Sequence, residues 1–454
     1  MILPARLLAL ILGSLAILAQ AAEDPAATLV IRNARIFDGR NATLREGVDI
    51  IIGGNKILAI TTATQLPPDV RVIDAAGRVV IPGLIDAHIH PSVTVSFAAL
   101  GDTDPSYNAA RSTVEARGIL RRGFTTVRDM GGSSFGLKRA IDEELIEGPR
   151  IFPSGAIISQ TSGHGDHRLR TDSPPRRWSG RIDIAEQLGF ALTADGADEV
   201  LSAVREQLRL GATQIKLTAG GGISSAWDPI DSVQFLAPEL RAAVEAAADW
   251  GTYVAVHAYT PLSIRRSVEA GVRSIEHAHL IDEATMKLIA ERGVFLSPQA
   301  YFFGGAGSPG AAVRDAALPS TPVQRAQRDK AQLVSTGLDR MMQLAKKYNV
   351  KVAFGTDAFG SSRAFALQSN EFGARLRWFT PLEILRQATS INADLLALSG
   401  PRNSYGRLGV IEPGALADLL IVAADPLQDI RVLEMPDKNL LVIVKDGKLV
   451  KNLL

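Results

Sequence analysis

The sequence predicts an α/β protein in which a (β/α)8 barrel carries a small β-sandwich domain built from both ends of the chain. Two observations predict this fold. Strand and helix patterns alternate from residue 81 to about residue 400, whereas the stretches on either side read as short strands alone. In addition, the seven histidines fall at or just after predicted strand ends, which is where the active site of such a barrel forms.

The first residues have the pattern of a secretory signal peptide. Arg6 precedes an apolar run over 7–18, and Ala19-Gln20-Ala21 is a small-x-small cleavage signal. We therefore expect cleavage after Ala21 and export to a bacterial periplasm or the medium. The apolar run is short for a bilayer span, and an uncleaved anchor is the alternative. The chain has no cysteine, so we expect no disulfide framework after export.

Composition and charge favour a globular protein that acts on small molecules. The chain has 454 residues, of which 46% are apolar, and this is enough to fill one large barrel. Cleavage after Ala21 removes one of the 49 basic residues and none of the 48 acidic ones, which leaves the mature chain formally neutral. This balance argues against a nucleic-acid surface or a polybasic membrane patch.

The two ends of the chain are expected to form one domain. Short strand patterns occupy residues 28–32, 48–52 and 56–60 near the amino terminus. Similar patterns lie at 417–422 and 441–445, and the second ends in the hairpin signal Asp446-Gly447. Neither end has enough strands for a core of its own. We therefore predict a composite β-sandwich from residues 22–80 and 401–454.

The central part, residues 81–400, is expected to form the barrel. The strand candidates are 79–86, 125–128, 150–154, 214–218, 253–256, 274–276, 294–297 and 352–355. The helix candidates are 105–121, 198–210, 237–250, 263–270, 282–291 and 325–348. A doubly wound sheet is the alternative, but it would distribute the histidines over several crevices.

Metal-ligand residue types gather at the predicted strand ends. His88 and His90 stand two residues apart, so they share one face of the first strand. Lys216 lies in the fourth strand, while His257, His277 and Asp357 follow the fifth, sixth and eighth strands. Neutral imidazole and carboxylate groups suit zinc, and the absence of thiolates excludes a closed structural zinc finger.

These motifs resemble those of the amidohydrolase superfamily. The resemblance rests on Pro82-Gly-Leu-Ile-Asp-Ala-His-Ile-His90, the lysine of the fourth strand, the two single histidines and Gly355-Thr-Asp357. It covers essentially the whole mature chain. The glycines that follow Lys216 and the run Glu276-His-Ala are most similar to the prolidase-like, carboxypeptidase-type branch.

The resemblance implies a centre with two divalent ions, most commonly zinc. His88, His90 and Asp357 would hold the first ion, while His257 and His277 would hold the second. Lys216 would react with carbon dioxide to give a carbamate that bridges both ions. The implied reaction is attack of a metal-bridging hydroxide on an amide carbonyl, with Asp357 passing the proton to the departing amine.

The resemblance also implies linear amide substrates with a free C-terminal carboxylate. Dipeptides and N-acyl amino acids qualify, and relatives on this branch hydrolyse the acyl-phenylalanine ochratoxin A. Among the residues expected to contact substrate are His164 for the carboxylate or oxyanion, Tyr259 as a hydroxyl donor, and the arginines Arg168, Arg170 and Arg363. We expect His279 to support its neighbours and the long segment 299–322 to shape an apolar pocket.

Three other functions share parts of this pattern. A cyclic-amide hydrolase of the imidazolonepropionase, dihydroorotase or hydantoinase type would use the same ligands, although export argues against its usual cytoplasmic substrates. A mononuclear deaminase generally lacks the bridging lysine. A catalytically silent binding protein would not need the complete ligand set. A homo-oligomer is also compatible with the sequence.

Overall fold

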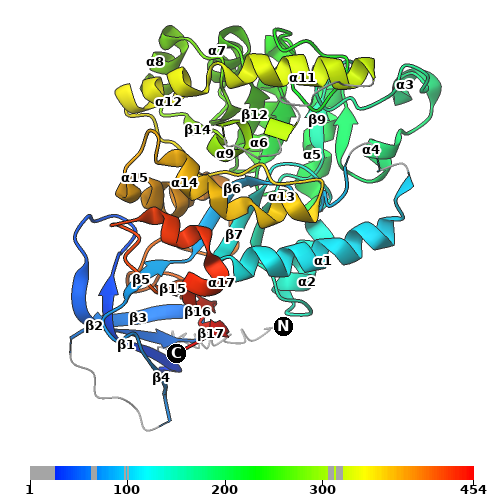
Figure 1. Cartoon of the computed structure of the whole chain (residues 1–454). Coiled ribbons are helices and arrows are strands. Elements are labelled where there is room, and N and C mark those ends of the chain that lie inside the picture. The colour runs from blue at the N-terminus through cyan, green and yellow to red at the C-terminus, as the bar shows by residue number, and fades with distance from the viewer. Residues whose placement is uncertain (1–25, 63–68, 97–98, 100–101, 305–310, 313–320) are drawn as a thin grey trace, which may run out of the picture.

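The computed structural model describes residues 26–62, 69–96, 99, 102–304, 311–312 and 321–454. The predicted signal peptide lies outside these residues. Both ends of the chain contribute to one eight-stranded sheet with the order β17-β16-β15-β5-β1-β2-β3, in which β4 pairs with β1. Figure 1 shows its blue amino-terminal and red carboxy-terminal strands together at the lower left. The strands are β1 (Leu29–Ile36), β2 (Arg45–Gly53), β3 (Lys56–Thr61), β4 (Arg71–Asp74), β5 (Val79–Pro82), β15 (Leu419–Val422), β16 (Leu440–Lys445) and β17 (Lys448–Asn452).

The two ends of the chain meet where β5 pairs with β15. These strands run antiparallel, with Val79 opposite Val422 and Pro82 opposite Leu419. Apolar side chains from both ends, among them Ile31, form one buried cluster beneath this sheet. The terminal segments thus share a core that neither could build alone.

The strand predicted over residues 79–86 is two strands. β5 belongs to the terminal sheet, whereas β6 (Leu84–Ile89) pairs in parallel with β7 in a separate sheet. Gly83 separates them and donates its N–H to the carbonyl of Asp418 at 2.8 Å. A Cβ atom at Gly83 would lie 2.2 Å from the hydroxyl oxygen of Thr125, so only glycine allows the two sheets to approach this closely.

The central part contains parallel strands in two sheets. One has the order β6-β7-β8 and the other the order β10-β9-β11-β12-β13-β14. The N–H of Thr213 donates to the carbonyl of Pro153 at 2.8 Å and joins the end of β8 to the start of β11. Besides β6, the strands are β7 (Phe124–Asp129), β8 (Arg150–Pro153), β9 (Ile157–Ser159), β10 (Ala191–Thr193), β11 (Ile215–Thr218), β12 (Val254–Ala258), β13 (Ser274–His277) and β14 (Phe295–Ser297).

The predicted eighth strand, residues 352–355, is not a regular strand, but it connects both ends of this parallel series. The N–H of Ala353 donates to Leu296 of β14 at 2.8 Å. On the other side, the N–H of Ala87 in β6 donates to the carbonyl of Phe354 at 2.8 Å. The N–H of Phe354 is bound by the side chain of Asn392 at 3.0 Å, which removes one backbone donor from a regular ladder.

Helices lie between most successive parallel strands, as the alternation predicts. The first, α1, has the predicted bounds and is capped by Asp104, whose carboxylate accepts the N–H of Ser106. The helices are α1 (Pro105–Arg121), α2 (Phe135–Asp142), α3 (Arg176–Ser179), α4 (Ile184–Gln187), α5 (Ala197–Leu210), α6 (Ala237–Asp249), α7 (Pro261–Ala270), α8 (Glu283–Glu291), α9 (Ala300–Gly304), α11 (Pro322–Ser335), α12 (Leu338–Lys347), α13 (Ser362–Ala366), α14 (Glu371–Arg375), α15 (Pro381–Arg386), α16 (Asn392–Leu396) and α17 (Pro436–Asn439), with short helical segments η2 (Gln368–Asn370), η3 (Gln387–Ile391), η4 (Ala397–Arg402) and η5 (Ile430–Glu434).

The single helix predicted over 325–348 is two helices, α11 and α12. The helix is interrupted at Gly337, where a Cβ atom would lie 1.9 Å from the carbonyl oxygen of His279. The break therefore allows the backbone to pack against the segment that follows β13. In the part of the chain that the structure describes, no helix is both long and apolar enough to span a membrane.

Candidate metal centre and cavity

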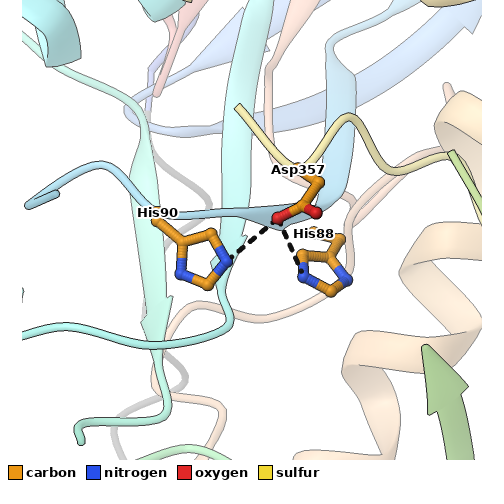
Figure 2. Close-up of side chains that lie close together, drawn as sticks. All are labelled: His88, His90 and Asp357. Atoms are coloured by element: carbon orange, nitrogen blue, oxygen red, sulfur yellow. Dashed lines mark hydrogen bonds and ion pairs between the residues drawn. The ribbon is translucent and has the colours of Figure 1, made fainter. Parts of the chain in front are cut away.

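Three of the predicted ligands form a compact group. Their ligand atoms, from His88, His90 and Asp357, all lie within 4.8 Å of one another. A carboxylate oxygen of Asp357 lies 3.2 Å from Nε2 of His90 and 3.5 Å from Nε2 of His88 (Figure 2). Both imidazoles come from the end of β6 and point to the same side, as their spacing predicts. The geometry and donor types fit a divalent metal ion.

The backbone around Asp357 directs its carboxylate toward the two histidines. Asp357 has φ of 55°, a left-handed conformation that is uncommon for residues other than glycine. Its N–H donates to the carbonyl of His88 at 2.7 Å. His277 has φ of 75°, and such strained residues are concentrated at functional sites.

Hydrogen bonds fix the orientation of both imidazoles. Nδ1 of His88 lies 2.8 Å from a carboxylate oxygen of Glu276, and Nδ1 of His90 lies 2.9 Å from the carbonyl oxygen of Gly131. In each ring Nδ1 is therefore the donor, which leaves the lone pair of Nε2 directed at Asp357. Burial lowers the pKa of His88 to about 4, so its ring is neutral at pH 7, as metal binding requires.

Glu276 is itself held by a buried arginine. Arg128 donates two hydrogen bonds to Glu276, at 2.8 and 2.9 Å, and both side chains are fully buried. Burial would raise the pKa of Glu276, but the charge of Arg128 lowers it below its usual range. Sequence reasoning did not assign this pair a role. The available signal was a charged residue at the end of each of two predicted strands, 125–128 and 274–276.

The remaining predicted ligands lie on the neighbouring strands β11, β12 and β13. The rings of His257 and His277 are 4.5 Å apart between centroids, and His277 is 5.1 Å from the ring of His88. Lys216 is 3% exposed and lines the same cavity. Burial lowers its pKa to about 8, which leaves part of the amine uncharged and nucleophilic near neutral pH. The structure thus places all six predicted ligands around one cavity.

This cavity has a volume of about 570 Å³ and is lined by both metal-ligand candidates and apolar side chains. Phe302, Phe303 and Phe359 contribute aromatic surface, and the ring of Phe359 lies 5.7 Å from that of His90. The first two come from α9, at the start of the segment 299–322, much of which lies outside the described residues. A wider groove of about 940 Å³, between α2 and α5, contains none of the predicted site residues.

His164 and Tyr259 both line the cavity, as expected. The His164 ring stacks on His257 with 4.2 Å between centroids, and its Nδ1 lies 2.6 Å from the hydroxyl of Ser225. The Tyr259 ring lies 4.8 Å from His257 and 5.3 Å from His277. Burial raises the pKa of Tyr259 well above its usual value, so its hydroxyl keeps its proton.

The arginines of the predicted carboxylate site differ in position. Arg168 is ion-paired with Asp166 and Arg170 stacks on Trp227, and neither lines the cavity. Arg363 does line it, and its guanidinium makes no ion pair with the part of the chain that the structure describes. The structure therefore does not place Arg168 or Arg170 at the cavity, since Asp166 holds the first and Trp227, in the loop after β11, stacks on the second.

His279 lies behind the cavity wall rather than in it. Its ring is 5.6 Å from Tyr259 and 4.3 Å from Phe303. Burial lowers its pKa to about 3, so the ring is neutral at pH 7. It packs as a neutral ring against residues that form the wall.

The family model that matches this chain and the known proteins similar to it agree with the motifs described above. The model of the amidohydrolase family matches residues 79–450. The ochratoxinase of Aspergillus niger is 30% identical over 448 residues, covering 95% of this chain and 88% of that protein. A prolidase complexed with N-methylphosphonate-L-proline is 35% identical, with a TM-score of 0.83 over 93% of this chain and 99% of its own. A Xaa-Pro dipeptidase with bound methionine in the active site is 31% identical, with a TM-score of 0.80 over 93% and 100%.

Proposed function

This chain belongs to the amidohydrolase family and is a hydrolase, and we propose that it cleaves the amide bond of linear substrates that carry a free C-terminal carboxylate. Dipeptides and N-acyl amino acids are the proposed substrate class. The similar prolidase and Xaa-Pro dipeptidase structures hold a proline analogue and methionine, respectively. Similarity to an ochratoxinase adds aromatic acyl-phenylalanines such as ochratoxin A.

The observation that carries this proposal is the set of side chains that line the cavity. Metal-ligand candidates lie at one part of its surface, aromatic side chains at another, and the guanidinium of Arg363 at a third. A guanidinium matches a carboxylate in shape and charge. An amide with an apolar acyl group and a terminal carboxylate would satisfy all three.

The proposed metal centre contains two divalent ions, most commonly zinc. His88, His90 and Asp357 would hold one ion, and His257 and His277 the other, with Lys216 as a carbamate between them. Support comes from the donor types and from the clustering of the ligand atoms of the first group within 4.8 Å. When bound, the ions would polarise the scissile carbonyl and lower the pKa of water from about 15.7 towards ~7.

Residues of the chain would perform the proton transfers and hold the substrate. Burial would raise the pKa of Asp357, but nearby positive charge, including that of Lys216, lowers it, so the carboxylate is ionised and can accept a proton. Asp357 would then pass this proton to the leaving amine nitrogen, since an amine anion is a poor leaving group. Tyr259 would donate a hydrogen bond to the oxygen of the reacting carbonyl. His164 would do the same from Nε2 when its ring is protonated on both nitrogens.

We also propose that the parallel strands close into a (β/α)8 barrel over residues 81–400, attached to a composite β-sandwich domain from residues 22–80 and 401–454. Hydrogen bonds from 352–355 to both β14 and β6 support the closure. The pairing of β5 with β15 supports the composite domain. Export after cleavage at Ala21 is a further proposal, which amino-terminal sequencing of the mature protein would test.

The proposed function can be tested by a substrate screen. Zinc-loaded protein is assayed with dipeptides, N-acyl amino acids and ochratoxin A, with the same compounds amidated at the C-terminus, and with cyclic imides. We expect release of a free amino acid from the carboxylate compounds and much slower turnover of the amidated ones. Turnover of the cyclic imides alone would overturn the proposal. Metal content is measured on the same samples.

A further inference from the structure

A buried ion pair lies beside His164 and has no place in the reaction described above. The carboxylate of Asp228, which is 2% exposed, lies 3.1 Å from Nζ of Lys330. Two opposite charges removed from water repay the cost of desolvation only when their geometry is well defined and their remaining bonds are satisfied. The Asp228–Lys330 pair meets both conditions.

Lys330 fastens α11 to the loop that follows β11. Besides Asp228, its ammonium group donates to the carbonyl of Gly222 at 2.9 Å and to that of Ser225 at 3.0 Å. All three of its protons therefore have an acceptor. One turn earlier on α11, the amide of Gln327 donates to the carbonyl of Ser224 at 2.8 Å. Gln327 also lines the cavity, so this attachment fixes part of the cavity wall.

The same loop determines the orientation of His164. The hydroxyl of Ser225 donates to the carbonyl of Gly222 at 3.2 Å, so it accepts a hydrogen bond from Nδ1 of His164 at 2.6 Å. A carboxylate oxygen of Asp228 lies 3.6 Å from the same nitrogen. Nδ1 therefore carries a proton. A Cβ atom at Gly222 would lie 2.1 Å from the ring, so the loop backbone is packed directly against it.

We propose that Asp228 and Lys330 are positioning residues: their ion pair holds the loop after β11 against α11 and fixes the ring orientation of His164, with Nδ1 donating to Ser225. Gly222 connects the two halves of this arrangement, because its N–H donates to Asp228 at 2.7 Å while its carbonyl accepts from Lys330. The inference rests on the proposed function only in assigning His164 a contact with substrate.

The first test separates positioning from simple stabilisation. Lys330→Met leaves Asp228 buried without its counter-charge, so we expect a lower melting temperature and at least a tenfold loss of kcat, with metal content unchanged. The double variant Lys330→Met/Asp228→Asn removes both charges, so its melting temperature should recover while kcat stays low. If kcat recovers together with the melting temperature, the pair is only structural and the proposal is overturned.

Two variants serve as matched comparisons. Lys330→Arg keeps the charge and should retain more activity than Lys330→Met. Lys347→Met removes a lysine of α12 that forms an exposed ion pair with Glu283, and should leave kcat unchanged. If Lys330→Met does not fold, the double variant alone decides between the two outcomes.

The second test needs no substrate. Nitrogen-15 spectra of histidine-labelled, zinc-loaded protein report which ring nitrogen carries the proton, and His164→Gln identifies the relevant signal. We expect Nδ1 of His164 to be protonated in the wild type and only partly protonated in the double variant. An unchanged signal would overturn the proposal. If the signal changes but no carboxylate substrate is cleaved, the positioning role stands and the proposed function fails.

Discussion

Lys216 is the residue on which the proposed metal centre most depends. It is 3% exposed and lies on β11, next to the strand that carries His257. Replacing it with alanine removes the anion that would balance the second ion. We therefore expect Lys216→Ala to bind less metal and to have a kcat at least about 100-fold lower than the wild type. Loss of a residue that only orients a metal ligand typically lowers metal affinity or activity by about 10- to 100-fold. Metal analysis and steady-state kinetics check this, with Lys347→Ala as control. Full retention of metal and turnover would exclude a bridging lysine.

Arg363 is expected to determine the preference for a carboxylate. Hydrogen bonds to charged groups contribute roughly 1.5–3 kcal/mol, so Arg363→Gln should raise KM for dipeptides by about 10-fold or more, with a smaller effect on kcat. Substrates amidated at the C-terminus should be cleaved equally by the variant and the wild type. Arg168→Gln is the matched control, because Arg168 is paired with Asp166 outside the cavity. An equal effect of the two changes would contradict this assignment.

His167 should make the stability of the protein depend on pH. Burial lowers its pKa from 6.5 to about 4. The unfolded chain therefore binds a proton below about pH 6.5, while the folded protein does so only near pH 4. Its contribution to stability is complete above pH 6.5 and is lost as the pH falls to 4. Because the ring is partly exposed, we expect ~1–2 kcal/mol.

Urea titrations of the wild type and His167→Gln at pH 7.5 and 4.5 measure this contribution. The wild type should lose more stability than the variant between the two pH values. A difference that does not change with pH would show that His167 does not titrate in this window.

The sequence pattern located most strands and the longer helices, but not the points where the chain passes from one sheet or helix to the next. Residues 79–86 form one continuous apolar run, yet the chain leaves one sheet and enters another at Gly83. Likewise, helical periodicity continues across Gly337, where α11 ends and α12 follows. Apolar periodicity reports that a segment is buried, but not which surface buries it.

In the candidate site, too, local sequence patterns predicted some residues and could not predict others. His88 and His90 could be found because their spacing encodes a shared strand face, and the other metal-ligand candidates because each lies in or follows a predicted strand and matches a motif of the family. By contrast, Arg128 and Glu276 are 148 positions apart, and Asp228 and Lys330 are 102 apart. Only the folded structure shows that such residues meet, since no local pattern connects them.

The junction at Gly83 leads to a prediction about stability. A Cβ atom there would lie 2.2 Å from the hydroxyl and 2.7 Å from the methyl carbon of Thr125, and 2.9 Å from the Cβ of Asp418. Overpacking of this kind typically costs 1–3 kcal/mol, so Gly83→Ala should lower the free energy of unfolding by about that amount. Gly136→Ala in α2, where the new Cβ has no neighbour within 4 Å, should instead stabilise by roughly 0.5–1 kcal/mol. Guanidinium titrations compare the two, and equal effects would contradict the packing argument.

The terminal sheet and the parallel strands are joined by a buried cluster of charges. Arg150, at the start of β8, is 1% exposed and donates to the carboxylate of Asp418 at 3.0 Å and to that of Asp446. Asp418 precedes β15, and Asp446 lies in the turn between β16 and β17. Burial would lower the pKa of Arg150, but the two carboxylates raise it, so the guanidinium remains charged. One side chain of the parallel strands thus contacts two segments of the terminal sheet.

Removing Arg150 should therefore destabilise the whole molecule without affecting its chemistry. Arg150→Met leaves Asp418 buried without a counter-charge, and breaking a buried pair in this way costs about 3–5 kcal/mol. We expect that loss in the free energy of unfolding from guanidinium titrations, whereas kcat of the folded variant should be unchanged because the proposed catalytic side chains lie at the opposite ends of the strands. Adding Asp418→Asn should recover part of the stability, because it removes the uncompensated charge. A loss below about 1 kcal/mol would show that Arg150 contributes no more than an exposed pair, and that apolar packing alone holds the terminal sheet to the parallel strands.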